Sequence, residues 1–233
     1  MDEDFSKEYI DDVPSTPVWR GSDYLLFYGK GSVKWEYDSS SQTFVHTNNP
    51  YSLYGYYFVT DATPTNDMTS VAQASGASTR ITTYDDYLLH EQELVSVNQS
   101  GREFFGEDFS GARPRTISTF SSIPGITGAD GKVTMRFISR INSGSGTASL
   151  SINDSELLDI TIPSIQTVSS NVRSYTKAIP GTTTALWKGS KSEKNNVVVS
   201  YSSSGHTNVR LDYIRMQFVR TLRPYGACTF SEA

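Results

Sequence analysis

The sequence predicts an all-β fold of the β-sandwich, jelly-roll-like type, formed either as one domain or as two packed β-domains. Residues that favour strands are abundant: aromatic residues make up 12% of the chain, with 14 Tyr and 11 Phe. Long helix-forming runs of Ala, Leu, Glu and Lys are absent. The apolar runs are short and are separated by Gly, Pro, Asn and Asp, which is the spacing expected for sandwiches and jelly rolls.

The first half of the chain contains a predicted β-hairpin between two further predicted strands. Residues 24–28 (YLLFY) are a short apolar run followed by glycines, which indicates a buried strand. Residues 33–37 alternate apolar and charged side chains, and residues 43–46 return as a strand after the turn residues 38–41 (DSSS). Residues 54–60 (YGYYFVT) predict the next strand.

Residues 84–97 fit two patterns, because their apolar side chains can be placed on a helical face or on one side of a strand; we predict the strand. Residues 101–111 have glycines at both ends and at Gly106, which predicts a sharp turn. From Thr116 onward the strand pattern is more regular. It predicts strands over residues 116–123, 132–141, 147–152, 157–162, 182–187, 197–201 and 209–222.

The last of these strands changes its alternation in the middle. Val209 and Leu211 share one parity, whereas Ile214 and Met216 share the other. A regular strand would send these two pairs to opposite faces of the sheet. A β-bulge near Tyr213 would return both pairs to the core, and the alternative is a central strand that is buried on both faces.

These patterns divide the chain into three parts. Residues 1–21 are acidic and polar and are predicted to be disordered or extended. Residues 22–112 form an aromatic-rich β region, and residues 113–233 form the β-sandwich domain. The boundary is placed where a loop-rich half gives way to regular strands.

The charge and the chain start restrict the function classes. The net charge of −5 argues against nucleic-acid binding, and we interpret Arg210, Arg215, Arg220 and Arg223 as a solvated strand face. The sequence has no run that is long and apolar enough to span a bilayer, so we expect no membrane insertion. The acidic start at Met1 does not resemble a signal peptide, so the protein is either cytoplasmic or begins after a removed signal, and the resemblance described below favours the second, extracytoplasmic interpretation.

The residues that usually perform catalysis or bind metals do not form a complete site in this sequence. His46, His90 and His206 lack the spacing of a zinc site, so each is interpreted as structural. Cys228 lies near the chain end without a cysteine-protease signature, and a buried small side chain is the preferred interpretation. We therefore expect no catalytic residue, no metal and no cofactor in this chain.

Four aromatic residues of the first half, Trp35, Tyr37, Tyr54 and Tyr56, have two interpretations. They could form a platform on which sugar rings stack, which would make a glycan the partner. The same residues also suit a hydrophobic core, and we favour the core.

Two stretches carry more specific information. The first comprises residues 27–31 (FYGKG), 34–38 (KWEYD), 44–46, 48–49, 51–52 and 56–58, and the second comprises residues 84–91 (YDDYLLHE) and 100–109 (SGREFFGEDF). Together they resemble the region that precedes the catalytic domain in the sortases of the type IX secretion system, which are gingipain-family cysteine peptidases of Bacteroidetes. The specific part is the pattern S-G-R-E-W-[FY]-G-E-x-F, which residues 100–109 match except that Phe104 replaces Trp. Residues 211–214 and 225–230 also resemble the end of that region.

The resemblance implies a parent enzyme that removes C-terminal sorting signals from secreted cargo and attaches the cargo to anionic lipopolysaccharide at the outer membrane surface. The family's Cys–His dyad lies in a downstream caspase-like α/β domain, and Cys228 does not match the nucleophile. The resemblance thus implies a non-catalytic scaffold or docking module, whose partners are the downstream catalytic domain and secretion-system proteins. A carbohydrate-binding module or surface adhesin remains the alternative, followed by a hydrolase or metal site built from dispersed carboxylates.

Within the matched motif, five residues are candidates for an interaction site: Gly101, Arg102, Glu103, Gly106 and Glu107. The glycines permit tight turns, and the charged residues could form a paired network that fixes the turn within the chain. The alternative is that the motif contacts the catalytic domain.

Overall fold

The computed structural model describes residues 15–60, 67–72, 75–76, 79–97, 103–141, 143–165, 178–188, 191–205, 207–223 and 225. Apart from a short 3₁₀ turn, η1 (Ser118–Phe120), the regular elements in these ranges are all antiparallel β-strands. The all-β sandwich prediction is therefore confirmed. The chain divides into two units, Met1–Arg80 and Ile81–Ala233, which are described separately below.

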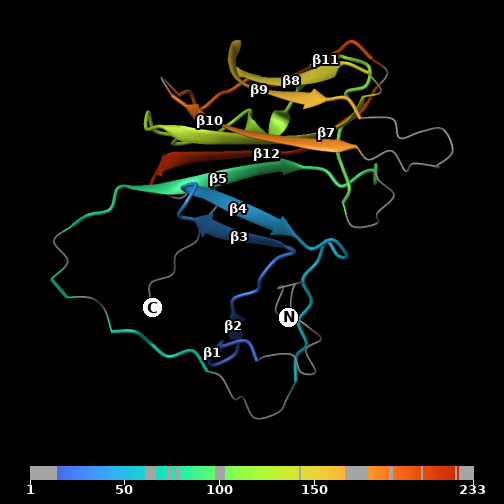
Figure 1. Ribbon diagram of the computed structural model, residues 1–233. Helices are drawn as coiled ribbons and strands as arrows, with labels where there is room; N and C mark the ends of the chain where they lie inside the picture. The colour runs from blue at the N-terminus through green and yellow to red at the C-terminus, as the bar shows by residue number, and fades with distance from the viewer. Residues whose placement is uncertain are drawn as a thin grey trace. The chain divides into compact units, whose positions relative to one another are not determined.

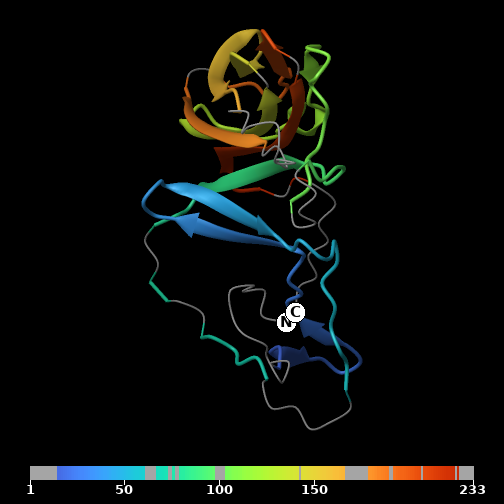
Figure 2. The same ribbon diagram turned by 45° about the vertical axis from the view of Figure 1, so that its right-hand side comes forward.

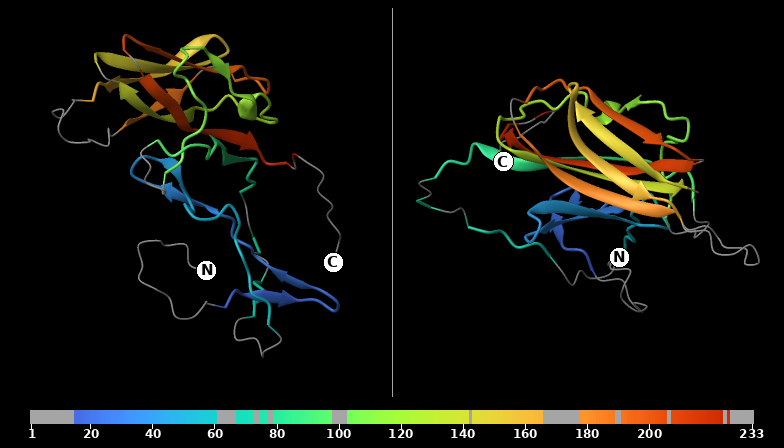
Figure 3. Two further views of the ribbon diagram at one scale, coloured as in Figure 1. Left: turned by 90° about the vertical axis from the view of Figure 1, so that its right-hand side faces the viewer. Right: turned by 45° about the horizontal axis from the view of Figure 1, so that its top comes forward.

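The second unit is a two-layer sandwich (Figure 1). One sheet has the strand order β10-β7-β12-β5 and the other has the order β6-β11-β8-β9. The strands are β5 (Thr83–Glu91), β6 (Arg115–Thr116), β7 (Gly131–Ile141), β8 (Ser145–Ile152), β9 (Ser155–Pro163), β10 (Ile179–Trp187), β11 (Val197–Ser203) and β12 (Thr207–Thr221). Figures 2 and 3 show the two layers of this unit from further directions.

The connections give this unit the jelly-roll topology. Going along the chain, β5, β7, β10 and β12 lie in one sheet, while β6, β8, β9 and β11 lie in the other. The late strands insert between early ones, so that β12 lies between β5 and β7, and β11 lies between β6 and β8. Eight strands connected in this way make the two Greek keys of a jelly roll.

The core lies between the two sheets because alternate side chains of each strand point inward. On β7, Val133, Met135 and Phe137 are fully buried, and on β11 Val197 and Val199 are as well. The remaining members of this cluster come from β8, β9, β11 and β12, from Trp187 at the end of β10, and from four residues outside the strands: Phe109, Ile117, Phe120 and Ile123. Burial of this apolar surface is the main stabilising contribution to the unit.

The predicted bulge in the last strand is confirmed. The pairing of β12 with β7 runs from Leu211 opposite Phe137 directly to Tyr213 opposite Arg136, so Asp212 is the extra residue. As a result, Leu211 before the bulge and Ile214 after it are both fully buried.

The first unit consists of two short hairpins. Strand β1 (Val18–Arg20) pairs with β2 (Leu25–Phe27), and β3 (Val33–Asp38) pairs with β4 (Thr43–Asn48), which confirms the predicted hairpin. The β3–β4 turn is held by the Asp38 carboxylate, which accepts hydrogen bonds from the hydroxyl groups of Ser41 and Ser40 at 2.6 and 2.7 Å. These bonds lower the pKa of Asp38 to about 2.

Three predictions about the elements need correction. Residues 54–60 form no strand, and residues 25–27 form a strand that is exposed instead of buried. Residues 116–123 contribute only the end of β6 and η1. A β pattern gives the tendency of a segment but not its neighbours. Residues 54–60 have no partner strand in the described part of the chain, whereas residues 25–27 pair with β1 but are not covered by other side chains.

The division into units also differs from the predicted boundary after residue 112. Strand β5 pairs with β12 over its whole length, from Thr83 opposite Thr221 to Glu91 opposite Tyr213, so the sandwich begins before residue 84. The predicted N-terminal segment 1–21 lies outside the described residues up to residue 14, and its end contains β1.

Candidate functional site

The described part of the matched motif, residues 103–109, continues the sheet where β5 ends. Gly106 N–H donates to the Leu211 carbonyl at 2.8 Å, and Leu211 N–H donates to the Glu107 carbonyl at 3.1 Å. Phe109 N–H donates to the Val209 carbonyl at 2.9 Å. The motif thereby satisfies the backbone of β12 beside the bulge, where β5 no longer reaches.

The two buried phenylalanines of the motif hold opposite faces of this sheet. Phe109 packs edge-on against Phe137 in the main core, with ring centroids 5.2 Å apart. Phe105 belongs to a smaller buried cluster that contains Ile138. Because Phe137 and Ile138 are neighbours on β7, they point to opposite faces, so the motif is anchored on both.

Position 106 requires glycine because the backbone of Gln92 and of Leu211 lies too close to leave room for a side chain. An added Cβ would lie 3.1 Å from Gln92 Cβ, 3.2 Å from the Gln92 carbonyl oxygen and 3.3 Å from the Leu211 carbonyl oxygen. Two of these neighbours are backbone atoms, and Leu211 is fixed between paired strands. A side chain at this position would push the motif away from β12.

Each carboxylate of the described motif is paired with a basic side chain from another part of the same unit. Glu103 contacts Arg136 at 3.2 Å, Glu107 contacts His90 at 2.7 Å, and Asp108 contacts Arg210 at 3.4 Å. These pairs join Glu103, Glu107 and Asp108 to other parts of the same unit. Gly101 and Arg102 lie outside the described residues, and the interdomain alternative stays a prediction.

His90 is the centre of a hydrogen-bonded chain of three side chains. Its Nε2 lies 2.7 Å from Glu107 Oε1, and its Nδ1 lies 2.8 Å from Thr119 Oγ1. Burial has the largest single effect and would raise the pKa of Glu107, but the hydrogen bond from His90, a backbone hydrogen bond and the nearby charge of Arg115 together keep the pKa below its usual value. A hydroxyl, an imidazole and a carboxylate hydrogen-bonded in this order are the groups of a nucleophilic triad, in which the carboxylate orients the imidazole. Here they connect β5, the motif and η1.

The bulge residue Asp212 forms the second part of the network. Its carboxylate is paired with Arg136, which also contacts Glu103, and Asp212 is only 4% exposed. Burial raises the pKa of Asp212 to about 6, although Arg136 acts in the opposite direction. Breaking such a pair by removing one partner leaves an uncompensated buried charge.

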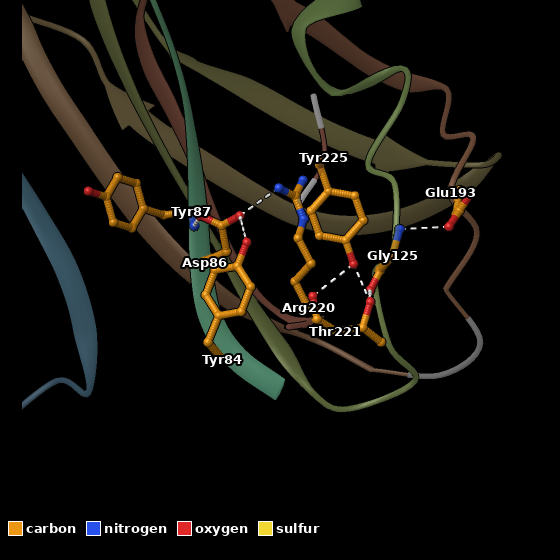
Figure 4. Close-up of polar contacts among 8 residues, drawn as sticks. All are labelled: Tyr84, Asp86, Tyr87, Gly125, Glu193, Arg220, Thr221 and Tyr225. Atoms are coloured by element: carbon orange, nitrogen blue, oxygen red, sulfur yellow. Dashed lines mark hydrogen bonds and ion pairs between the residues drawn. The ribbon is translucent and has the colours of Figure 1, made fainter. Parts of the chain in front are cut away.

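At the other end of β12, Tyr225 packs against the sheet (Figure 4). Its hydroxyl donates to the Thr221 carbonyl at 2.8 Å, and the Arg220 guanidinium lies 4.6 Å from its ring centroid. Arg220 is also paired with Asp86 at 2.8 Å. Gly125, with φ of +71°, lies beside the hydroxyl end of the ring, where a Cβ would overlap the phenol.

These contacts correct the interpretation of the β12 arginines as a solvated face. Arg210 and Arg220 are paired with carboxylates, and Arg215 is only 8% exposed and lies 5.7 Å from the Tyr213 ring centroid. Arg223 alone of the four is exposed, and it lies 3.8 Å from Glu193. The sequence could not show this, because Asp108 is 102 residues from Arg210.

The aromatic candidates of the first unit do not form a core, which corrects the favoured interpretation. Tyr37, Tyr54 and Tyr56 are exposed, while Trp35 is half-buried beside the His46 ring. The buried hydrophobic side chains of the described residues all lie between Val97 and Phe218. Residues 15–60 therefore bury no hydrophobic side chain fully.

Residues 51–60 are a long exposed apolar segment, of which only Tyr54 and Tyr56 were named as candidates, for a glycan platform. Its exposed large apolar side chains are Tyr51, Leu53, Tyr54, Tyr56, Tyr57, Phe58 and Val59. The sequence signal was available, since YSLYGYYFVT contains no charged residue. A patch of this kind usually marks an interaction surface.

The structure provides two further observations about the described ranges. They contain no helix with the length and apolar character needed to cross a membrane. They also contain no group of three or more His, Cys, Asp and Glu side chains suited to a metal ion. His206 and Cys228 lie outside these ranges.

Comparison with known proteins identifies one informative relative. No protein-family profile and no curated protein matches the chain. Among solved structures, dimeric latent PorU from Porphyromonas gingivalis matches with a TM-score of 0.74 and 30% identity, over 97% of this chain and 21% of that chain. The chain thus spans about a fifth of the length of this PorU.

Two weaker matches carry no argument. A subunit of the disulfide-linked endospore appendages of Bacillus is 9% identical, with a TM-score of 0.29 over 66% of this chain and 100% of its own. The CBM35 module of Abf62 from Cellvibrio japonicus is 15% identical, with a TM-score of 0.26 over 62% of this chain and 100% of its own.

Proposed function

Because this chain is a PorU-like β-region, we propose that it is a non-catalytic N-terminal module of a sortase-like, gingipain-family cysteine peptidase of the type IX secretion system. In this proposal the peptidase machinery belongs to the remainder of a longer parent protein, and the module lies outside the cytoplasm at the outer membrane surface. Its role is to serve as a scaffold or docking element for that remainder. Support comes from the 30% identity over 97% of the chain, together with coverage of only 21% of PorU.

One observation carries the docking role. Residues 15–60 expose many large apolar side chains and bury none of them fully in the described part of the chain. Two-stranded hairpins without a covered face are marginally stable in water. Exposed apolar surface of this extent is typical of an interface that another polypeptide covers. The remainder of the parent is the partner that is always present at high effective concentration.

The jelly roll is a stable unit in its own right. Its motif, its bulge and its ion pairs are fixed by contacts within the unit, from Phe105 and Phe109 in the interior to the Arg136–Asp212 pair. A module with its own core can fold as part of a longer protein without contributing to the chemistry.

The direct test uses the parent in two pieces. This chain and the remainder of the parent, co-expressed as separate polypeptides, should copurify as a 1:1 complex, and the remainder should melt at a higher temperature with the chain than without it. The isolated chain should not cleave peptides that the full parent cleaves. Failure of the two pieces to associate, with the remainder folded and active, would contradict the docking role.

Glycan binding is a second candidate, and the exposure of Tyr54 and Tyr56, at 70% and 63%, is the observation that favours it. Exposed aromatic rings can stack on sugar rings, whereas buried ones cannot. Binding of the isolated chain to a glycan array, lost in Tyr54→Ala and Tyr56→Ala variants, would support this function in place of docking.

A further inference from the structure

Residues 54–60 combine the sequence of a β-strand with the absence of a partner strand. The stretch YGYYFVT contains aromatic and β-branched residues and carries no charge. In the structure it follows β4 as coil (Figure 1) and pairs with no strand among the described residues. Such a disagreement between local tendency and observed state is expected at functional sites.

The segment is nevertheless held in place on one side. The Tyr57 hydroxyl donates to the Lys30 carbonyl at 3.2 Å and accepts a hydrogen bond from the Lys30 N–H. The Tyr57 ring lies 5.2 Å from the Phe27 ring, and at Gly55 an added Cβ would lie 2.6 Å from the Lys30 carbonyl oxygen. These contacts fix the segment against residues 27–31.

The opposite side of the segment is open. In an extended strand Tyr54, Tyr56 and Phe58 point away from the face that carries Tyr57. These three side chains are 70%, 63% and 80% exposed. No hydrogen bond donated by the amides of residues 56–59 is found among the described residues. The segment thus offers backbone donors and an aromatic face together.

We propose that residues 54–60 add as a β-strand to the open edge of a sheet in the remaining polypeptide of the PorU-like parent. This inference rests on the proposed function and specifies how the docking occurs. Main-chain hydrogen bonds would provide the affinity, and pockets for Tyr54, Tyr56 and Phe58 would provide the specificity. About four fifths of the matched PorU lies outside the region that this chain covers, which provides the length from which the edge can come.

Hydrogen–deuterium exchange of the full-length parent tests the pairing directly. In the isolated 233-residue chain, the amides of residues 56–59 should exchange at rates near those of an unfolded peptide. In the full-length parent, every second one of these amides should exchange at least about tenfold more slowly, because a strand that pairs on one side donates ladder hydrogen bonds from alternate residues. Fast exchange in the parent would overturn the inference.

Matched proline variants provide the second test. Val59 and Val71 are 85% and 90% exposed in the first unit, so Val59→Pro and Val71→Pro make the same change at similar exposure. Proline removes a ladder donor only where a ladder exists. Because a strand paired on one side donates from every second residue, proline is placed at 58 and at 59 in turn, with Phe58→Ala as the control for loss of the ring. We expect the more damaging of Phe58→Pro and Val59→Pro to weaken the complex of chain and remainder by about tenfold or more, and Val71→Pro to leave it unchanged. Equal effects of all three proline variants would refute the strand pairing.

The outcomes separate this inference from the function on which it rests. If the two pieces do not associate, the docking role itself fails. If they associate while residues 56–59 exchange rapidly, docking stands and the strand addition is wrong. If the isolated chain forms a dimer that protects these amides, a second copy is the partner, and the inference is overturned.

Discussion

The contact between Gly125 and Tyr225 gives the most decisive stability prediction. In Gly125→Ala, alanine must adopt φ of +71°, and its Cβ must displace the Tyr225 ring. The left-handed conformation costs about 1–2 kcal/mol for a residue with a Cβ. Displacing Tyr225 removes its hydrogen bond to Thr221, worth about 1 kcal/mol, and its contact with Arg220, worth about 0.5–1 kcal/mol.

Gly125→Ala should therefore lower the free energy of unfolding by about 2.5–4 kcal/mol, measured by urea denaturation of the 233-residue chain. Gly128→Ala is the matched control, because an added Cβ there meets nothing within 4 Å, and it should be neutral. In a Tyr225→Ala background, the cost of Gly125→Ala should fall to about 1–2 kcal/mol, since only the backbone term remains. A cost that is the same in both backgrounds would refute the steric argument, and a neutral Gly125→Ala would refute it entirely.

Three further predictions concern the motif and the bulge. The pKa of Asp212 is raised to about 6, so the folded state binds the proton of this carboxyl group more tightly than the unfolded chain does. The contribution of Asp212 to the free energy of unfolding is therefore complete below about pH 4 and is lost as the pH rises to about 6. Asp212→Asn should flatten this part of the pH dependence of the urea midpoint, and an unchanged slope would contradict the assignment. Gly106→Ala should destabilise by about 1–2 kcal/mol through overpacking, while Gly111→Ala, with nothing within 4 Å, should not. His90→Ala leaves the half-buried Glu107 without its partner and should cost about 1–3 kcal/mol in thermal unfolding, a loss that the double variant with Glu107→Leu should partly restore.

The features that the sequence predicted well depend on neighbouring residues. The bulge at Asp212 follows from the change of parity between Leu211 and Ile214, which a single strand reveals by itself. The β3–β4 hairpin likewise follows from local alternation and from a turn that begins at Asp38. For such elements the physical information lies within a few residues along the chain.

The features that were missed depend on contacts between distant residues. Strand β5 was ambiguous because its partner is β12, more than a hundred residues later. The pairing of Glu107 with His90, and of Arg210 with Asp108, likewise requires the fold to be known. For residues 54–60 the β pattern was recognised, but the predicted strand does not form because no other strand in the described part of the chain pairs with it.

The register of β5 with β12 has a mechanical consequence. Thr83, where the polypeptide enters the jelly roll, lies directly opposite Thr221, where it leaves, so the two backbone positions are about 5 Å apart. Tension applied between these two points would break the hydrogen-bonded residue pairs of β5 and β12 one after another, instead of loading all of them at once. The jelly roll should therefore peel open at low force from this corner, although its interior is densely packed.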